Sequence, residues 1–196
     1  MKDILFTHIK LIIWDLDETF WKGILSEGSV TPISENIALI KSLTDHGIVN
    51  SICSKNDYKP TVDTLKELGV NDLFVFKSID WTPKGPRISK MIKDMGLRPV
   101  NCLFIDDNIV NLNEAKFYEK DLMIAEPSIL SELHQFLESN PPSDLKHKRL
   151  KNYQVLEQKQ AAKAEATDNL AFLYDSDTRV EIHRDCIEHI ERISEL

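Results

Sequence analysis

The sequence predicts an α/β fold, a Rossmann-like, doubly wound parallel sheet that is followed by a C-terminal helical extension. Strand-length apolar runs alternate with helical stretches five times within residues 11–137. Parallel strands need crossover connections, and right-handed crossovers place helices on both faces of the sheet. Several apolar runs also end directly in polar or acidic residues, which is where open α/β sheets carry their chemistry.

The expected elements follow one another in short steps. Apolar runs predict strands at 11–15, 48–53, 73–76, 100–105 and 122–124. Helical spacing predicts helices at 34–46, 60–68, 84–95, 109–118 and 128–137. After the first strand, the adjacent Phe20 and Trp21 stand in a glycine-containing segment that could form a small hairpin over the site. The gaps before Ser54 and Lys84 are filled by these elements, so we expect no large cap domain.

A change of composition predicts two parts of the chain. The run Asn140-Pro141-Pro142-Ser143 separates a core at 1–140 from an extension at 141–196. Residues 144–166 are charged and predict a solvated helix lying against the core, with a partner-binding helix as the alternative. A short helix at 168–173, a strand at 179–183 and a helix at 185–196 are expected to follow. The last helix reaches Leu196 on an apolar face, so we expect the chain to continue, as the start of a truncated second domain.

Composition narrows the choice of partner and compartment. The 196 residues are 42% hydrophobic and 29% charged, as in ordinary globular proteins, and the formal net charge is −8. That charge argues against nucleic acid or an anionic membrane as the main partner. Cys53, Cys102 and Cys186 show no paired spacing, which indicates free thiols in a reducing cytoplasm. No apolar run approaches the length of a membrane span.

Two carboxylates follow the first apolar run. Asp15 and Asp17 stand two residues apart, so in an extended segment their side chains start on the same face. Carboxylates this close repel, and one must hold a proton or both must share a cation. The alternative is a strand followed by an acidic turn, since Asp is a common turn residue.

Polar residues at the other strand ends fit a phosphoryl-transfer site. Ser54 follows the second strand and could donate to a phosphate oxygen, and Lys84 would add a positive charge. Each could also be ordinary, as a turn residue, a surface lysine or, for Asp106-Asp107, a helix cap. Mg²⁺ prefers a few oxygen ligands, and Asp15, Asp106 and a backbone carbonyl near Asp17 could supply them.

The motifs resemble those of the haloacid dehalogenase (HAD) superfamily of phosphotransferases. The matching residues span about 9–125 and are Trp14-Asp15-Leu16-Asp17-Glu18-Thr19, Ser54, Lys84 and Ile105-Asp106-Asp107. The resemblance implies a Mg²⁺-dependent phosphatase or phosphotransferase that forms an aspartyl-phosphate on Asp15, with Asp17 as general acid and base. It further implies that Ser54, Lys84 and Asn56 bind substrate, that Asp15, Asp17 and Asp106 hold the metal, and that Asp107 and Thr19 support the site.

A narrower resemblance points to the FkbH-like branch, subfamily IIIC. It depends on Trp21-Lys22-Gly23, Glu27-Gly28, Ser54-Lys55-Asn56, Trp81-Thr82-Pro83-Lys84 and Phe104-Ile105-Asp106-Asp107-Asn108. That branch implies glyceryl transfer from a phosphorylated glycerate to an acyl carrier protein, for methoxymalonyl-type units. The chain departs from it at Glu18, where Asn or Gly is usual, and at Ile109 and Asn111, where the branch has Pro and Glu.

Three functions therefore follow as hypotheses. The first is a phosphatase acting on a phosphorylated small molecule or on a substrate tethered to a carrier protein. The second is glyceryl transfer to an acyl carrier protein, and the third is a non-catalytic interaction module. Because a site without a lid excludes water poorly, we expect a bulky or tethered substrate or a covering subunit.

Overall fold

The structure is a computed structural model that describes residues 6–165. The elements expected at 168–173, 179–183 and 185–196 lie outside the described residues, as does Cys186. By contacts the chain divides into two compact units, the first ending at Glu157 and the second beginning at Gln158.

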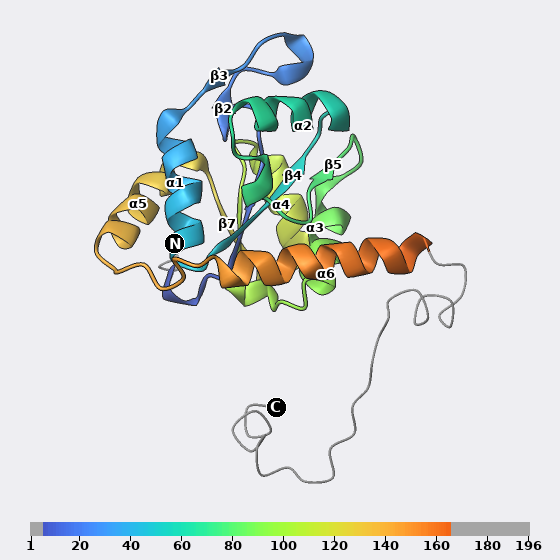
Figure 1. Cartoon of the computed structure of the whole chain (residues 1–196). Coiled ribbons are helices and arrows are strands. Elements are labelled where there is room, and N and C mark those ends of the chain that lie inside the picture. Colours follow the sequence, from blue (N-terminus) through green and yellow to red (C-terminus); the bar gives the residue numbers. More distant parts are fainter. Residues whose placement is uncertain (1–5, 166–196) are drawn as a thin grey trace. The chain divides into compact units, whose positions relative to one another are not determined.

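Within residues 6–157, five parallel strands form the central sheet (Figure 1). They are β1 (Leu11–Trp14), β4 (Val49–Ser54), β5 (Ser78–Ile79), β6 (Cys102–Ile105) and β7 (Met123–Ala125). The strand order is β5-β4-β1-β6-β7, with β1 in the centre and Leu11 opposite both Val49 and Cys102. The order reverses at β1, and such a switch point opens a crevice beyond the carboxyl ends of the strands.

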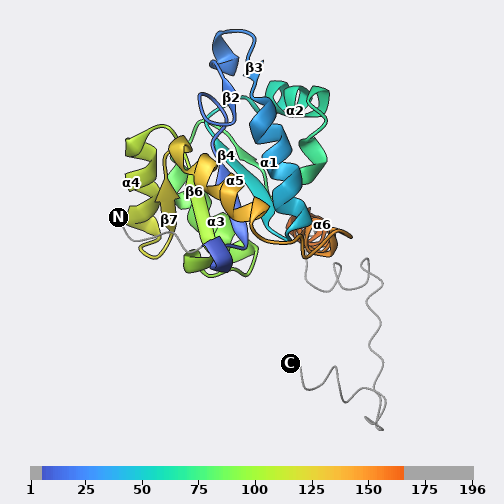
Figure 2. The same cartoon turned by 90° about the vertical axis from the view of Figure 1, so that its left-hand side faces the viewer.

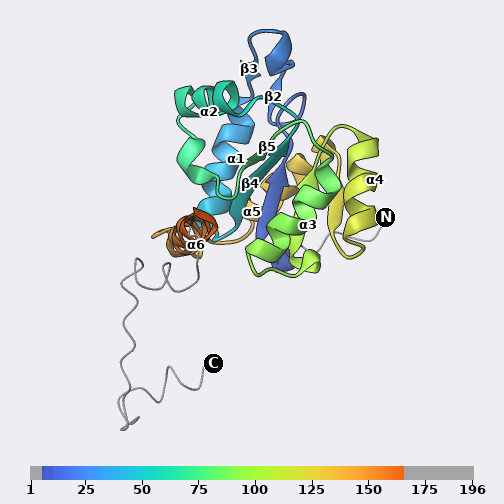
Figure 3. The same ribbon diagram turned by 90° about the vertical axis from the view of Figure 1, so that its right-hand side faces the viewer.

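Helices cover both faces of the sheet (Figures 2 and 3). Their bounds are α1 (Ser34–Asp45), α2 (Tyr58–Glu67), α3 (Lys84–Asp94), α4 (Ile109–Tyr118) and α5 (Leu130–Glu138). Ile12 and Trp14 of β1 pack with α1, α2 and α5, whereas Leu11 and Ile13 pack with α3 and α4. Alternate residues of one strand thus serve two separate cores, as a doubly wound sheet requires. The predicted fold class is confirmed.

The third predicted strand, at 73–76, is wrong. Residues Asn71–Leu73 form a 3-10 turn, Phe74 makes a single bridge to Asn50, and the strand itself comes later, as β5. Phe74 and Val75 are buried, which explains their apolar character without a strand. Phe76 ends the extended run because its φ is 53°, in the left-handed region. The other predicted strands and helices are present with their ends shifted by a few residues.

A small hairpin stands at the carboxyl edge of the sheet, where the sequence predicted one. Its strands are β2 (Trp21–Lys22) and β3 (Thr31–Pro32), which pair antiparallel around the 3-10 turn Leu25–Glu27. Figure 1 shows it at the top of the view, beyond α1 and α2. Between β1 and α3 the structure holds only this hairpin, α1, α2, short 3-10 turns and the strands β4 and β5, so no cap domain interrupts these residues.

The charged segment after the predicted boundary is helical, as expected. Helix α6 spans Lys148–Glu165. In its first part Leu150 is buried, the Arg149 guanidinium donates to the Gly47 carbonyl oxygen at 2.8 Å, and the Phe76 N–H donates to Glu157 at 2.7 Å. These residues therefore lie against the core, and the boundary at 141 remains a prediction. Cys53 and Cys102 are buried free thiols. No helix among the described residues is long and apolar enough to cross a membrane.

Candidate active site

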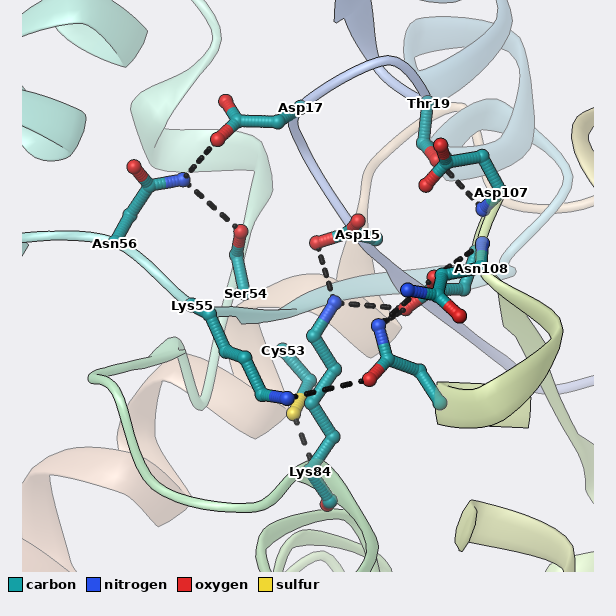
Figure 4. A network of polar contacts seen from close by, with 12 residues as sticks. Asp15, Asp17, Thr19, Cys53, Ser54, Lys55, Asn56, Lys84, Asp107 and Asn108 are labelled. Atoms are coloured by element: carbon teal, nitrogen blue, oxygen red, sulfur yellow. Dashed lines mark hydrogen bonds and ion pairs between the residues drawn. The ribbon is translucent and has the colours of Figure 1, made fainter. Parts of the chain in front are cut away.

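The residues predicted for the site meet at the carboxyl ends of β1, β4 and β6 (Figure 4). Asp15 stands directly after β1, and its backbone N–H donates to the Ile105 carbonyl oxygen at 2.9 Å. Asp106 follows β6 in the same way and donates to Ala125 at 3.3 Å. Both aspartates are thus held by backbone bonds that continue the sheet, which fixes where their side chains begin.

Lys84 joins the two buried aspartates. Its ammonium Nζ lies 2.6 Å from Asp15 Oδ1 and 2.7 Å from Asp106 Oδ2, and the side chain is almost fully buried. Lys84 is the first residue of α3, so the crossover helix delivers the charge to the strand ends. Burial alone would lower the pKa of Lys84, but the two carboxylates hold it above its ordinary value. Lys84 therefore stays charged and offsets part of the repulsion between Asp15 and Asp106.

Asp15 has the most perturbed carboxyl of the site. Burial raises its pKa to about 6, Lys84 opposes that rise, and Asp106 adds to it. Oδ1 of this carboxylate is buried and lies 2.6 Å from the Lys84 ammonium, in a close ion pair. A buried carboxyl group whose pKa is raised, and which lies beside a buried ammonium and further carboxylates, is typical of a group that receives a ligand or a reacting atom.

Asp106 is held from two sides. The Asn111 side chain donates to both of its carboxylate oxygens, at 3.1 and 3.2 Å, and the Asn108 N–H donates to Oδ1 at 2.8 Å. Asn111 had no predicted role. Its position on the first turn of α4, five residues after Asp106, could have indicated one, because a polar residue there faces back toward the strand end.

Thr19 and Asn36 brace the loop that follows β1. Thr19 Oγ1 accepts a hydrogen bond from the Asp107 N–H at 3.1 Å, which ties the ends of β1 and β6 together. The Asn36 amide donates to the carbonyl oxygens of Thr19 and Phe20, at 3.0 Å each. Thr19 thus acts on the site through the backbone of Asp107.

Three carboxylates could hold a metal ion. Oxygens of Asp15, Asp106 and Asp107 all lie within 4.8 Å of one another. Burial raises the pKa of Asp107, and the charge of Asp106 raises it further. Carboxylate oxygens suit a hard cation such as Mg²⁺, and a cation would offset the repulsion among these three carboxylates, so the residues fit this metal. The carboxylate of Asp17 is not in this group, and its predicted part in metal binding, by a backbone carbonyl, stays a prediction.

The Asp17 carboxylate instead lies between the hairpin and the end of β4. Oδ1 accepts hydrogen bonds from Trp21 Nε1 at 2.8 Å and from the Leu25 N–H at 3.2 Å. Oδ2 accepts one from the Asn56 amide at 3.0 Å, and the same amide donates to Ser54 Oγ at 3.2 Å. Asn56 therefore links Asp17 to Ser54.

Two further residues complete the surroundings of the site. Lys55 Nζ donates to Asn111 Oδ1 at 3.3 Å, a contact that the sequence did not indicate. Glu18, for which sequence reasoning had no explanation, has a φ of 54° and accepts a hydrogen bond from the Gly23 N–H at 2.7 Å. It closes the base of the hairpin beside the link made by Asp17.

Comparison with known proteins gives a match in structure alone. No protein-family profile matches the sequence, and no curated protein resembles it sufficiently to count as a relative. Among solved structures, the N-terminal part of a Bacteroides fragilis protein, which contains a phosphatase domain complexed with Mg, matches with a TM-score of 0.56 and 19% identity. The match covers 68% of this chain and 41% of that one, so this chain spans about two fifths of its length.

Two shorter structures match over most of their length. One is a Legionella pneumophila protein assigned to the HAD superfamily hydrolases, subfamily III A (TM-score 0.51, 14% identity, 76% of this chain, 91% of that one). This chain has the HAD fold. The other is a Vibrio cholerae protein assigned as a 3-deoxy-D-manno-octulosonate 8-phosphate phosphatase (TM-score 0.51, 14% identity, 70% of this chain, 90% of that one). The predicted resemblance is thereby confirmed for the fold, and the FkbH-like branch stays a prediction.

Proposed function

We propose that this HAD-fold chain is a Mg²⁺-dependent phosphatase or phosphotransferase that acts through an aspartyl-phosphate on Asp15. The observation that carries the proposal is the buried Asp15 carboxylate, which lies beside Lys84 and two further carboxylates. A purely structural ion pair needs one carboxylate for its ammonium, whereas here oxygens of three carboxylates lie within 4.8 Å of one another. The Bacteroides fragilis structure, which contains Mg, supports the choice of metal.

Each side chain has one task in this reaction. A carboxylate oxygen of Asp15 attacks phosphorus, and the bond from phosphorus to the leaving oxygen breaks. Asp17 gives its proton to that leaving oxygen and then takes a proton from the water that attacks phosphorus. In this second step the bond from phosphorus to Asp15 breaks, which restores the carboxylate. Ser54 and Lys84 hold the phosphoryl oxygens, and Asn56 orients Ser54.

The metal would be held by Asp15, Asp106 and Asp107, with a backbone carbonyl near Asp17 as a further ligand. When bound, Mg²⁺ supplies positive charge that offsets the phosphoryl oxygens and the carboxylates themselves. Asn111 and Asn108 keep Asp106 in place for this role.

The proposal is tested by replacing one carboxylate oxygen of Asp15. Asp15→Asn should abolish Mg²⁺-dependent hydrolysis of 4-nitrophenyl phosphate, because the amide is a poor nucleophile, while the circular dichroism spectrum stays that of the folded protein. Full activity in this variant would overturn the proposal. A screen of phosphate esters with and without Mg²⁺ would then define the substrate, and absence of Mg²⁺-dependent turnover would favour a non-catalytic interaction module.

The absence of a cap domain within the described residues favours a large or tethered substrate, and with it glyceryl transfer to an acyl carrier protein. Here the carrier thiol would attack the carboxyl carbon of a glycerate that is phosphorylated on that carboxyl. The thioester bond forms, the bond from that carbon to the phosphate oxygen breaks, and phosphate leaves. Mass spectrometry of a carrier protein incubated with the enzyme and this acyl phosphate of glycerate decides between the two. A gain of one glyceryl mass supports transfer, and release of phosphate without it supports an ordinary phosphatase.

A further inference from the structure

The Asp17 carboxylate is held by donors from two separate parts of the chain. Trp21 and Leu25 of the hairpin segment both donate to Oδ1, at 2.8 and 3.2 Å. Asn56, beyond the end of β4, donates to Oδ2 at 3.0 Å. Donors on both oxygens fix the rotation of the carboxylate about its bond to the chain, as well as its distance from β4.

Trp21 is well placed to hold this orientation. It is fully buried, it pairs with Pro32 across the hairpin, and its ring stands edge-on to Phe20 with centroids 6.1 Å apart. The indole therefore has little freedom of its own, and its N–H points at Asp17 because the packing of the ring requires it. Asn56 is equally constrained, since it is 2% exposed and also bonds Ser54 Oγ.

We propose that Trp21 and Asn56 are positioning residues, which aim the Asp17 carboxyl at the leaving oxygen of the substrate. The inference depends on the proposed function, in which Asp17 passes a proton to that oxygen as its bond to phosphorus breaks. Without the Trp21 donor, Oδ1 keeps only the longer bond from the Leu25 N–H, at 3.2 Å, so the carboxyl is held less tightly. Proton transfer then loses efficiency while attack by Asp15 does not. The same Asn56 amide also donates to Ser54, which is proposed to hold the phosphate. One side chain therefore positions both the phosphate-binding residue and the acid.

The test compares two substrates of nearly the same shape. Phenolate is a far more basic leaving group than 4-nitrophenolate, so phenyl phosphate depends strongly on the general acid and 4-nitrophenyl phosphate much less. Trp21→Phe keeps an apolar ring and removes the N–H. It should lower kcat/KM for phenyl phosphate about tenfold more than for 4-nitrophenyl phosphate, a part of the 10²–10⁴-fold that general acid catalysis contributes. The ratio of the two values is the readout, since a general loss of structure lowers both alike.

Trp81→Phe is the matched control. Trp81 Nε1 also donates to an aspartate, Asp57, at 2.9 Å, but that carboxylate is not one of the catalytic pair. The substrate ratio should stay at the wild-type value in this variant. Asn56→Ala is the second test, because it removes the donor to Oδ2 without touching the hairpin, and it carries the test alone if Trp21→Phe does not fold.

The outcomes separate the two proposals. The positioning role is wrong if Trp21→Phe or Asn56→Ala lowers both kcat/KM values equally, or if it lowers neither value. The phosphatase proposal stands in either case. A ratio that shifts as much in Trp81→Phe as in Trp21→Phe also overturns the positioning role. If the wild-type protein hydrolyses neither ester with Mg²⁺, or if Asp15→Asn retains activity, the proposed function itself fails.

Discussion

At the scale of single residues, the site is organised around one buried positive charge. Lys84 contacts Asp15 and Asp106, and its side chain is 2% exposed. Taking three charges out of water is costly, and their mutual attraction recovers that cost only while all partners are present. The buried charges therefore add little net stability, and we attribute their arrangement to the proposed function.

Removing that charge should destabilise the metal-free protein strongly. We expect Lys84→Met to lower the free energy of unfolding by about 3–5 kcal/mol, because Asp15 and Asp106 are left buried without a counter-ion. Urea denaturation measures the effect, and added Mg²⁺ should recover part of it. The control is Lys59→Met, at an exposed pair with Asp63, where about 0–1 kcal/mol is expected. Equal losses at the two positions would contradict this account.

Asp15 makes the stability depend on pH in the absence of metal. Its pKa is about 6 in the folded protein against 3.8 for a free carboxyl, so the folded state holds the proton more tightly. As pH rises from about 4 to about 6, the unfolded chain ionises first, and this group's contribution to stability falls. Mg²⁺ needs the ionised form, so its stabilising shift of the melting temperature should be larger at pH 7 than at pH 5. Equal shifts at the two pH values would contradict the assignment of Asp15 as a ligand.

At the scale of elements, α3 does more than carry Lys84. The Arg87 guanidinium, one turn later, donates to the carbonyl oxygen of Ser54 at 2.9 Å and to those of Asp80 and Thr82 at 2.9 and 3.1 Å. One side chain thus joins the end of β4 to the loop that leads into α3. The strand end that bears Ser54 is held by this helix and by the sheet together.

Arg87→Lys tests this brace. Lysine keeps the charge but cannot reach several carbonyl oxygens at once with a planar fork. We expect a loss of about 3 kcal/mol in unfolding free energy, the scale of one or two hydrogen bonds to a charged group. KM for 4-nitrophenyl phosphate should rise, because Ser54 loses its fixed position. Lys90→Met, at an exposed pair with Asp94 on the same helix, is the control and should change neither quantity appreciably.

The hairpin offers a second test at this scale. The backbone of Glu18 is in the left-handed region, and its carboxylate accepts a hydrogen bond from the Gly23 N–H at 2.7 Å. Asparagine adopts that backbone conformation more readily but is too short to make the same bond. Glu18→Asn should therefore change global stability by no more than about 1 kcal/mol, while the Gly23 amide exchanges hydrogen faster. Unchanged exchange at Gly23, measured by nuclear magnetic resonance, would show that Glu18 does not hold the hairpin.

At the scale of the whole molecule, the sequence predicts the fold better than the contacts within the site. The doubly wound layout needs only buried runs that alternate with helices, and β1 shows it by facing two opposite cores. The strand expected at 73–76 failed because Phe74 and Val75 are buried with only a single bridge, from Phe74 to Asn50. Burial of this kind without a continuous strand ladder looks the same in sequence.

The positions of the candidate site residues were predictable where a side chain ends a strand or follows it directly. Asp15, Ser54 and Asp106 come from that rule, and backbone bonds along the sheet make it reliable. Asn111 and Arg87 were missed because helices bring them back to the strand ends. Which way a helix face turns depends on packing against the sheet, and one sequence does not specify that.

The double use of Asp17 has a consequence for motion. The carboxylate that we propose as the acid also fastens the hairpin, through Trp21 and Leu25. A movement of the hairpin that breaks those two hydrogen bonds would also release the Asp17 carboxyl from its orientation. On the proposed mechanism, proton transfer therefore requires the hairpin to be in contact with Asp17, so the hairpin itself controls the reaction, with no cap domain among residues 6–157.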